Sequence, residues 1–318
     1  MSVAQRILAG DVRAVARLLR DIDDQIPSAR NILKELYPHT GRAYILGFTG
    51  SPGVGKSTLV DQMAMEYRKQ GLTVGILAID PTSPFTGGAI LGDRIRMQRH
   101  FLDDGVFIRS LATRGHFGGL TKSTHDMITV LDAMGKDIIM VETVGVGQDE
   151  VDIANCAHTT VLVTIPGMGD EVQAIKAGIM EIGNIFVVNK ADREGSRKTV
   201  RELRNLIELG LRRTGDEQWE PPIIETEALK GKGITELMDA VERHRQYLLE
   251  NDRSQWEAVS QKRAKTQLLE TLREEALAEL LRRMGKRGQS LDDLVRKVAE
   301  RQTDPYSVVQ DLLQCELR

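Results

Sequence analysis

The segment Tyr44–Met63, "YILGFTGSPGVGKSTLVDQM", constrains the fold of this chain more than any other stretch. It reads as a short apolar strand, a glycine-rich turn and an amphipathic helix that opens on Lys-Ser-Thr. Within it, "GSPGVGKS" has the Walker A spacing of a glycine, four residues and then Gly-Lys-Ser. Glycines let the backbone curl so that successive N–H groups face one anion, and the helix N-terminus adds positive charge. The segment therefore predicts a P-loop that binds the phosphates of a nucleotide.

Each position of this turn has an expected role. We expect Lys56 to bridge the β- and γ-phosphates and the Ser57 hydroxyl to bind Mg²⁺. A chance glycine turn is the alternative, and the strand before and the helix after the turn argue against it. The other positions expected to contact the nucleotide are Gly50, Ser51, Pro52, Gly53, Val54, Gly55 and Thr58.

Apolar runs of strand length alternate with helix-length segments from Tyr44 onward. Near-continuous apolar strands separated by helices indicate an α/β fold with a mostly parallel central sheet flanked by helices. Past about Glu250 the strand signals stop and a long helical pattern follows. We therefore expect three parts: an N-terminal helical extension over 1–40, a P-loop domain over 41–250, and a C-terminal helical dimerisation arm over 251–318.

A second motif, "NKAD", follows a later predicted strand and indicates which base is bound. The Asp192 carboxylate can accept two hydrogen bonds from the N1–H and the exocyclic amine of guanine. Adenine offers an unpaired N1 acceptor at that place, so a buried mismatch excludes it. We expect Asn189 and Lys190 to brace this loop and cover the base, which predicts GTP and GDP as the ligands. A backbone lid on the base is expected from Ala228, Leu229 and Lys230.

Acidic residues close two other predicted strands, where the nucleotide site of an α/β sheet opens. Asp80 closes one strand and Asp93 lies thirteen residues on, while Glu142 closes another and Gly145 follows three later. The last pair is a Glu version of the DxxG motif, in which the acid reaches Mg²⁺ through water and the glycine N–H senses the γ-phosphate. The alternative is that Asp80 and Glu142 merely cap strand ends.

The group that would orient the attacking water is missing from its usual position. Val146 follows Gly145, where Ras-type proteins carry a glutamine, and an apolar side chain cannot position water. We therefore expect slow GTP hydrolysis by the isolated protein, with the missing element supplied by rearrangement or by a partner. "PGMGDEVQAIKAG" is a candidate loop, from which either Lys176 or the acids Asp170 and Glu171 could swing toward the nucleotide. An ordinary helix N-terminus with acids in its first turn is the alternative.

Charge and composition exclude several classes of protein. A net charge of −3 and a pI near 6.1 provide no basic field for nucleic acid. The apolar runs fall short of the ~20 residues of a membrane span. Two cysteines, Cys156 and Cys315, form no disulfide framework, which favours a reducing cytoplasm. The N-terminus carries no signal-peptide core. From the charge and the length of the apolar runs, we expect no nucleic-acid and no membrane partner.

Five stretches together resemble one family: "GSPGVGKST", "DPTSPFTGGAILGDRIRM", "VETVGVGQDE", "PGMGDEVQAIKAG" and "NKAD". They are similar to the MeaB/ArgK GTPases, the methylmalonyl-CoA mutase-associated chaperones, and the likeness extends over essentially the whole chain. The resemblance implies a SIMIBI-class P-loop GTPase that is homodimeric through C-terminal helices. It also implies a chaperone that gates cofactor loading and protects an adenosylcobalamin-dependent acyl-CoA mutase.

The resemblance extends to single positions. Asp80, Asp93 and Glu142 fall on the family's acidic nucleotide-site positions, and Lys176 falls on the lysine of its extra switch loop. Mitochondrial relatives carry a transit peptide, which this sequence does not show, so a bacterial cytoplasmic form is expected.

Other functions remain open at this point. A small-molecule kinase or a transport-associated NTPase would use the same P-loop, with Glu142 or Asp80 as a base. Nickel or cobalt insertion is disfavoured, because the histidines are scattered and His116 and His125 lie nine residues apart. The apolar stripe of the arm indicates a partner surface, with folding back onto its own domain as the alternative; its leucines are Leu268, Leu269, Leu272, Leu277, Leu280 and Leu281.

Overall fold

The structure is a computed structural model of the 318-residue chain. It describes residues 1–80, 97–100, 102–112, 122–143, 149–167, 182–211, 219–250, 254–286 and 290–314. The chain divides into two compact units, Met1–Arg263 and Ala264–Arg318, and each is described by itself.

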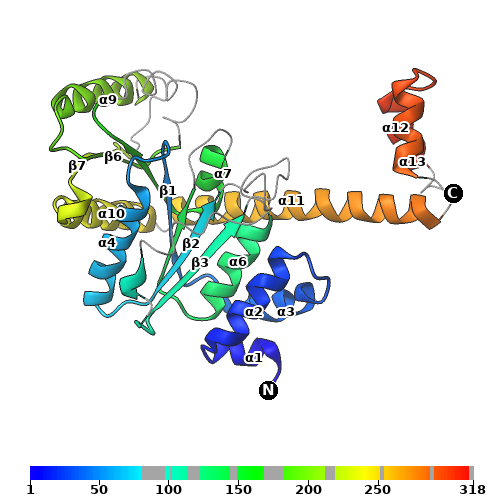
Figure 1. The fold of residues 1–318 in the computed structure, drawn as a ribbon, viewed down its shortest axis with the longest axis horizontal. Coiled ribbons are helices and arrows are strands. Elements are labelled where there is room, and N and C mark those ends of the chain that lie inside the picture. The colour runs from blue at the N-terminus through cyan, green and yellow to red at the C-terminus, as the bar shows by residue number, and fades with distance from the viewer. Residues whose placement is uncertain are drawn as a thin grey trace. The chain divides into compact units, whose positions relative to one another are not determined.

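A seven-stranded sheet forms the centre of the first unit, in the order β3-β2-β4-β1-β5-β6-β7, and every strand pair is parallel (Figure 1). This confirms the predicted α/β fold. The strands are β1 (Tyr44–Thr49), β2 (Val74–Asp80), β3 (Val106–Ala112), β4 (Ile138–Glu142), β5 (Thr159–Thr164), β6 (Ile185–Asn189) and β7 (Ile223–Thr226).

The register of the sheet places the P-loop. β1 lies between β4 and β5, and Phe48 stands opposite Glu142 at the carboxyl end of β4. The chain leaves β1 toward β2 on one side, while β5 lies on the other side of β1. In open parallel sheets, ligands bind outside the carboxyl ends of the strands where the strand order reverses. The turn after β1 is therefore at the ligand-binding edge of the sheet.

Helices cover both faces of the sheet. Successive residues of a strand point to opposite faces, so Tyr44 and Leu46 join one core cluster while Ile45 joins another. The first face carries α4 (Lys56–Lys69) and α10 (Ile234–Leu249). A smaller third cluster lies on the opposite face, where Leu162, Phe186 and Val188 of the sheet pack under α9 (Ser196–Leu211). The opposite face carries α1 (Val3–Leu8), α2 (Val12–Asp23), α3 (Ala29–Leu36), α6 (Lys122–Ala133) and α7 (Asp149–Cys156). Short 3₁₀ turns are η1 (Tyr37–His39), η2 (Gln98–His100) and η4 (Ala228–Lys230).

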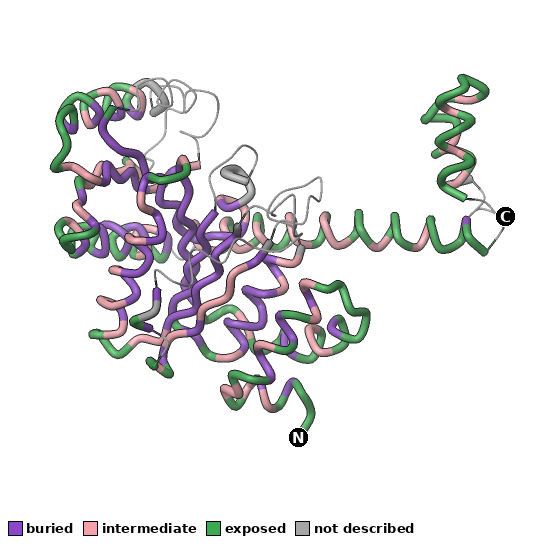
Figure 2. The backbone as a smooth tube through the Cα atoms, viewed as in Figure 1, coloured by how far each residue is buried: buried purple, intermediate pink, exposed green. Residues whose placement is uncertain are grey.

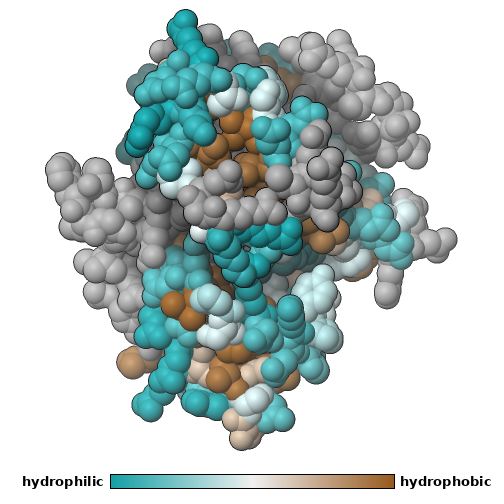
Figure 3. All heavy atoms as spheres, turned by 90° about the vertical axis from the view of Figure 1, so that its right-hand side faces the viewer, coloured by the Kyte–Doolittle hydropathy of each residue, from teal (hydrophilic) through white to brown (hydrophobic). Residues whose placement is uncertain are grey.

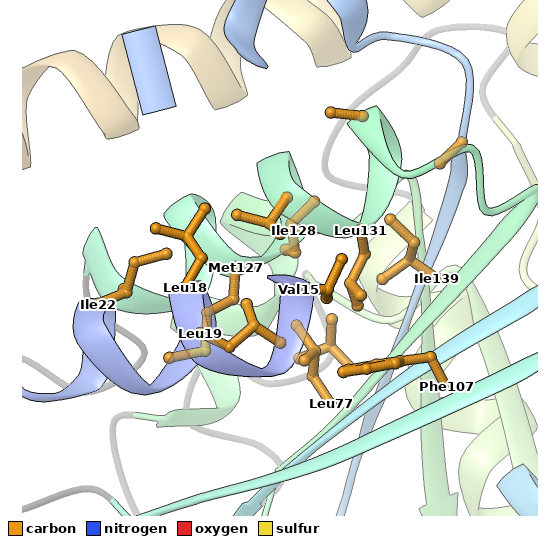
Figure 4. Packing of buried hydrophobic residues seen from close by; sticks show 14 of the residues in the cluster. Val15, Leu18, Leu19, Ile22, Leu77, Phe107, Met127, Ile128, Leu131 and Ile139 are labelled. Atoms are coloured by element: carbon orange, nitrogen blue, oxygen red, sulfur yellow. The ribbon is translucent and has the colours of Figure 1, made fainter. Parts of the chain in front are cut away.

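The N-terminal helices share the core of the sheet. In Figure 4, side chains of α2 point toward those of α6, and both groups meet Leu77, Phe107 and Ile139 of the sheet. The link into β1 is also held, because the Asp132 carboxylate of α6 accepts hydrogen bonds from the N–H groups of residues 41, 42 and 43 at 2.6 to 3.2 Å. The N-terminal extension is therefore part of the first unit.

The second unit is entirely helical in the part of the chain that the structure describes. It contains α11 (Ser254–Lys286) from Ala264 onward, α12 (Leu291–Ala299) and α13 (Pro305–Gln314). Figure 2 shows these helices as mostly exposed or intermediate, and Met284 is their one buried residue among those described. Five leucines of α11 are 37% to 68% exposed: Leu268, Leu269, Leu272, Leu277 and Leu281. The arm thus carries apolar side chains that this unit does not cover.

The outer surface is mixed in character. On the face in Figure 3, hydrophilic atoms make up most of the coloured surface and hydrophobic atoms form smaller patches between them. Among the described helices, none combines the length and apolar character that a membrane crossing requires.

Candidate nucleotide site

Two glycines of the P-loop are required by its geometry. The loop runs from the end of β1 at Thr49 to the start of α4 at Lys56. Gly50 has φ +133°, and a Cβ there would lie 2.0 Å from the carbonyl oxygen of Val163 in β5. Gly55 has φ +99°, and a Cβ there would lie 2.4 Å from Nδ2 of Asn189. A side chain at either position would both strain the backbone and displace the neighbouring strand or loop.

Lys56 lies inside the curled loop. Its ammonium donates to the carbonyl oxygens of Gly50 at 2.6 Å and Ser51 at 3.1 Å, and the residue is only 5% exposed. The start of α4 adds unsatisfied N–H groups and the positive end of the helix dipole. The arrangement concentrates positive charge at one buried place, which suits a phosphate group.

Ser57 and Glu142 meet at the base of the loop. The Ser57 hydroxyl donates to Oε1 of Glu142 at 2.6 Å, and both residues are buried. A hydroxyl and a carboxylate that face each other are oxygen donors of the kind that Mg²⁺ takes in proteins. The donor set therefore fits a magnesium ion bound beside a nucleotide.

A pair of threonines joins the two strands that carry these groups, and the sequence patterns did not reveal it. Thr143 follows Glu142 and is buried; its N–H donates to the carbonyl of Phe48 at 3.0 Å, and its hydroxyl lies 3.2 Å from that of Thr49. Thr49 immediately precedes the P-loop. The contact fixes the end of β4 against the end of β1, and thus Glu142 against the loop.

The "NKAD" loop is attached to the P-loop by two side chains. Asn189 donates through Nδ2 to the carbonyl of Val54 at 2.8 Å, and Lys190 donates through Nζ to the carbonyl of Gly53 at 2.7 Å. Lys190 has φ +55°, an uncommon conformation for a residue with a side chain. The structure therefore brings together two motifs that lie far apart in the sequence.

Asn189 also holds the loop that follows β7. Its Oδ1 accepts from the Thr226 hydroxyl at 3.0 Å and from the N–H of Ala228 at 3.1 Å. Ala228 is buried in the core cluster under α4, whereas Leu229 beside it is 86% exposed. One amide side chain thus connects the P-loop, the end of β6 and the expected lid.

The carboxylate expected to recognise guanine is paired in this structure. Oδ2 of Asp192 lies 3.3 Å from Nζ of Lys230, which also donates to Glu227 at 2.6 Å. Glu227 in turn accepts from Lys232 at 3.0 Å. The pKa of Lys230 is raised by Glu227 first and Asp192 second. Glu227 is a residue of this loop that sequence reasoning missed, since an isolated surface glutamate carries no signal.

The remaining residues singled out in the sequence divide into three groups. Asp80 ends β2, two residues beyond Ala78, which stands opposite Glu142; its side chain is not described. Ser51, Pro52 and Thr58 belong to the P-loop and the first turn of α4. Asp93, Gly145, Val146 and Lys176 lie outside the described residues.

Comparison with known proteins gives the family. A family model described as "Methylmalonyl Co-A mutase-associated GTPase MeaB" matches residues 15–285. A "Putative GTPase" of Pyrococcus abyssi is 51% identical over 311 residues, which is 97% of this chain and 94% of that protein. The mouse "Methylmalonic aciduria type A homolog, mitochondrial" is 37% identical over 64% of this chain and 49% of its own length. A crystal structure described as "LAO/AO transport system kinase" is similar with a TM-score of 0.69 and 25% identity, covering 99% of this chain and 97% of the other. The chain belongs to the MeaB family of P-loop GTPases.

Proposed function

We propose that this GTPase is a chaperone for an adenosylcobalamin-dependent acyl-CoA mutase, whose cofactor loading it gates and which it protects from inactivation. The observation that carries the proposal is the family match over residues 15–285, whose description names association with methylmalonyl-CoA mutase. The name of the mouse relative points to the same metabolic step. The site supports the proposal, because its parts suit a switch between GTP and GDP.

The described residues act on the nucleotide through position and charge. Lys56 and the N–H groups of the P-loop would bind the β- and γ-phosphates, and Ser57 with Glu142, whose side chains meet at 2.6 Å, would hold magnesium at the same edge. Magnesium supplies positive charge that stabilises the leaving phosphate oxygens. Asp192 recognises guanine, and Lys230, whose Nζ lies 3.3 Å from its Oδ2, stands beside the base.

Other site residues belong to the proposal on sequence grounds. Asp80 and Asp93 orient water around the metal, the Gly145 N–H senses the γ-phosphate, and Lys176 enters the site during hydrolysis. Because Val146 replaces the usual glutamine, hydrolysis is slow until the mutase completes the site.

The C-terminal arm forms a homodimer in this proposal. The exposed leucines of α11 are its support, since contiguous apolar side chains on a helix favour burial against a partner. The assembly works in the cytoplasm, where cysteines stay reduced.

The test measures phosphate release from GTP by the isolated protein, alone and with a purified acyl-CoA mutase. Stimulation by the mutase supports the proposal, and a fast rate without it contradicts the slow-switch mechanism. The similarity to a structure described as a transport system kinase supports a second candidate, a small-molecule kinase. Radiolabelled γ-phosphate distinguishes the two: a kinase transfers the label to an added amino acid or other small acceptor, whereas a switch releases it only as inorganic phosphate.

A further inference from the structure

Asp61 is a buried carboxylate on the helix that opens at the P-loop, and it takes no part in the site contacts described above. The residue is 3% exposed. It follows Ser57 by four positions in α4, so the two side chains share one face of the helix, about 6 Å apart along its axis. A buried charge at this separation is screened only weakly, so it acts on charges bound at Ser57.

The polar partners of Asp61 come from η2, and one of them, Arg99, is its counter-charge. The Arg99 guanidinium pairs directly with Oδ2, and Nε2 of His100 lies 3.0 Å from Oδ1. The His100 side chain is 4% exposed and that of Arg99 is 45% exposed. Arg99 also donates to the sulfur of Met65, one turn further along α4. Asp61 is thus a buried charge whose balance depends on a partly exposed arginine.

A second ion pair lies on the same side of α4, further from the P-loop. Arg68 donates through Nη2 and Nε to Asp103 at 3.0 to 3.1 Å. The two side chains are 26% and 32% exposed. Positions 61, 65 and 68 have the spacing of one helix stripe, along which α4 contacts Arg99, His100 and Asp103. The second pair joins the same two segments without lying near Ser57, so it provides a matched control.

We propose that Asp61 and Arg99 set the affinity of the nucleotide site for magnesium through their charges, one helical turn behind Ser57. This inference rests on the proposed binding of magnesium by Ser57 and Glu142. Removing the charge of Asp61 leaves the positive charge of Arg99 without its counter-charge, and this repels Mg²⁺. Removing the charge of Arg99 leaves Asp61 unbalanced and favours the cation. The two substitutions therefore have opposite effects.

The experiment titrates Mg²⁺ into the purified protein–GDP complex by calorimetry. Asp61→Asn weakens magnesium binding about tenfold, and Arg99→Met strengthens it about threefold. The second effect is smaller because the arginine is partly exposed and its charge is screened by solvent. The double variant Asp61→Asn/Arg99→Met lies between the two, close to the wild type. Arg99→Met keeps the alkyl stem, so its effect reports on charge.

Loosening of α4 would give a different pattern, because weaker packing lowers the affinity in all three variants. The control variants Asp103→Asn and Arg68→Met break the second ion pair, and each stays within about twofold of the wild type. Shifts in the same direction for Asp61→Asn and Arg99→Met, equal shifts in the controls, or no magnesium binding by the wild type would each overturn the inference. Lack of stimulation by a mutase is measured separately and overturns only the chaperone role.

Discussion

Replacing Asn189 by aspartate tests whether one amide joins the base loop to the P-loop. The orientation of the amide is fixed, because Oδ1 faces two donors, the Thr226 hydroxyl and the N–H of Ala228. Asn189→Asp keeps both of these bonds and nearly the same shape. It replaces only the Nδ2 donor, which lies 2.8 Å from the carbonyl of Val54, with an oxygen.

The magnitude follows from that single change. The lost hydrogen bond contributes about 1 kcal/mol, and a buried carbonyl left without its donor costs about 1 to 3 kcal/mol more. The new carboxylate also faces the carbonyl oxygen of Val54 at a position that is 2% exposed, and their repulsion raises the cost further. We expect the free energy of unfolding to fall by about 2 to 4 kcal/mol. Because GDP needs both loops in place, we expect its affinity to fall at least about tenfold.

Urea unfolding followed by tryptophan fluorescence measures the first quantity, since Trp219 and Trp256 both belong to the first unit. Titration with a fluorescent GDP analogue measures the second. The control is Asn184→Asp, at the other end of β6, where Oδ1 accepts from the N–H of Thr160 at 2.8 Å and aspartate can do the same. We expect that control to stay within about 0.5 kcal/mol of the wild type. Equal effects of the two substitutions, or unchanged GDP binding by Asn189→Asp, would refute the reasoning.

Three further predictions concern the loop, the metal and the buried histidines. Gly55→Ala should weaken GDP binding at least about tenfold more than Gly53→Ala, because both have positive φ but only the first Cβ meets Asn189; fluorescence titration measures both. Glu142→Gln keeps an acceptor for Ser57 but removes the charge, so calorimetry should show magnesium affinity lower by about tenfold or more. Burial lowers the pKa of His125 and of His244 to about 4, so the unfolded chain binds more protons below about pH 6.5 and stability is lost as pH falls from there toward 4. Urea unfolding at pH 7.5 and 5.0 should show a loss of about 2 kcal/mol for each of the two, and His244→Phe should remove its share.

The sequence predicted the parts of the fold that local patterns determine. The strand, glycine turn and helix around Lys56 are adjacent in the chain, so their spacing alone indicated the P-loop. Apolar runs likewise indicated the parallel sheet. The strand order was not predictable in this way, because the placement of β4 between β1 and β2 depends on packing across the sheet rather than on any one segment.

The contacts that join distant segments were missed for the same reason. The hydroxyl contact between Thr143 and Thr49 links two strands 94 residues apart. Asp61 reads in the sequence as a polar residue of an amphipathic helix, and only the fold brings Arg99 to it from 38 residues away. The local hydrophobic periodicity predicts which residues are buried, but it does not predict which distant residues they contact.

The position of β1 explains why the site has two separately supported halves. On one side, β4 supplies Glu142 to Ser57 and Thr143 to the end of β1, which supports the half proposed to bind phosphate and magnesium. On the other side, one strand beyond β5, β6 supplies Asn189, whose amide holds both the P-loop and the loop after β7. A central strand is the only kind that has neighbours on both sides, so a loop that follows it can be fixed from two directions at once. The switch proposed above would use both supports, with the γ-phosphate sensed on the β4 side of the loop and the base held from the β6 side.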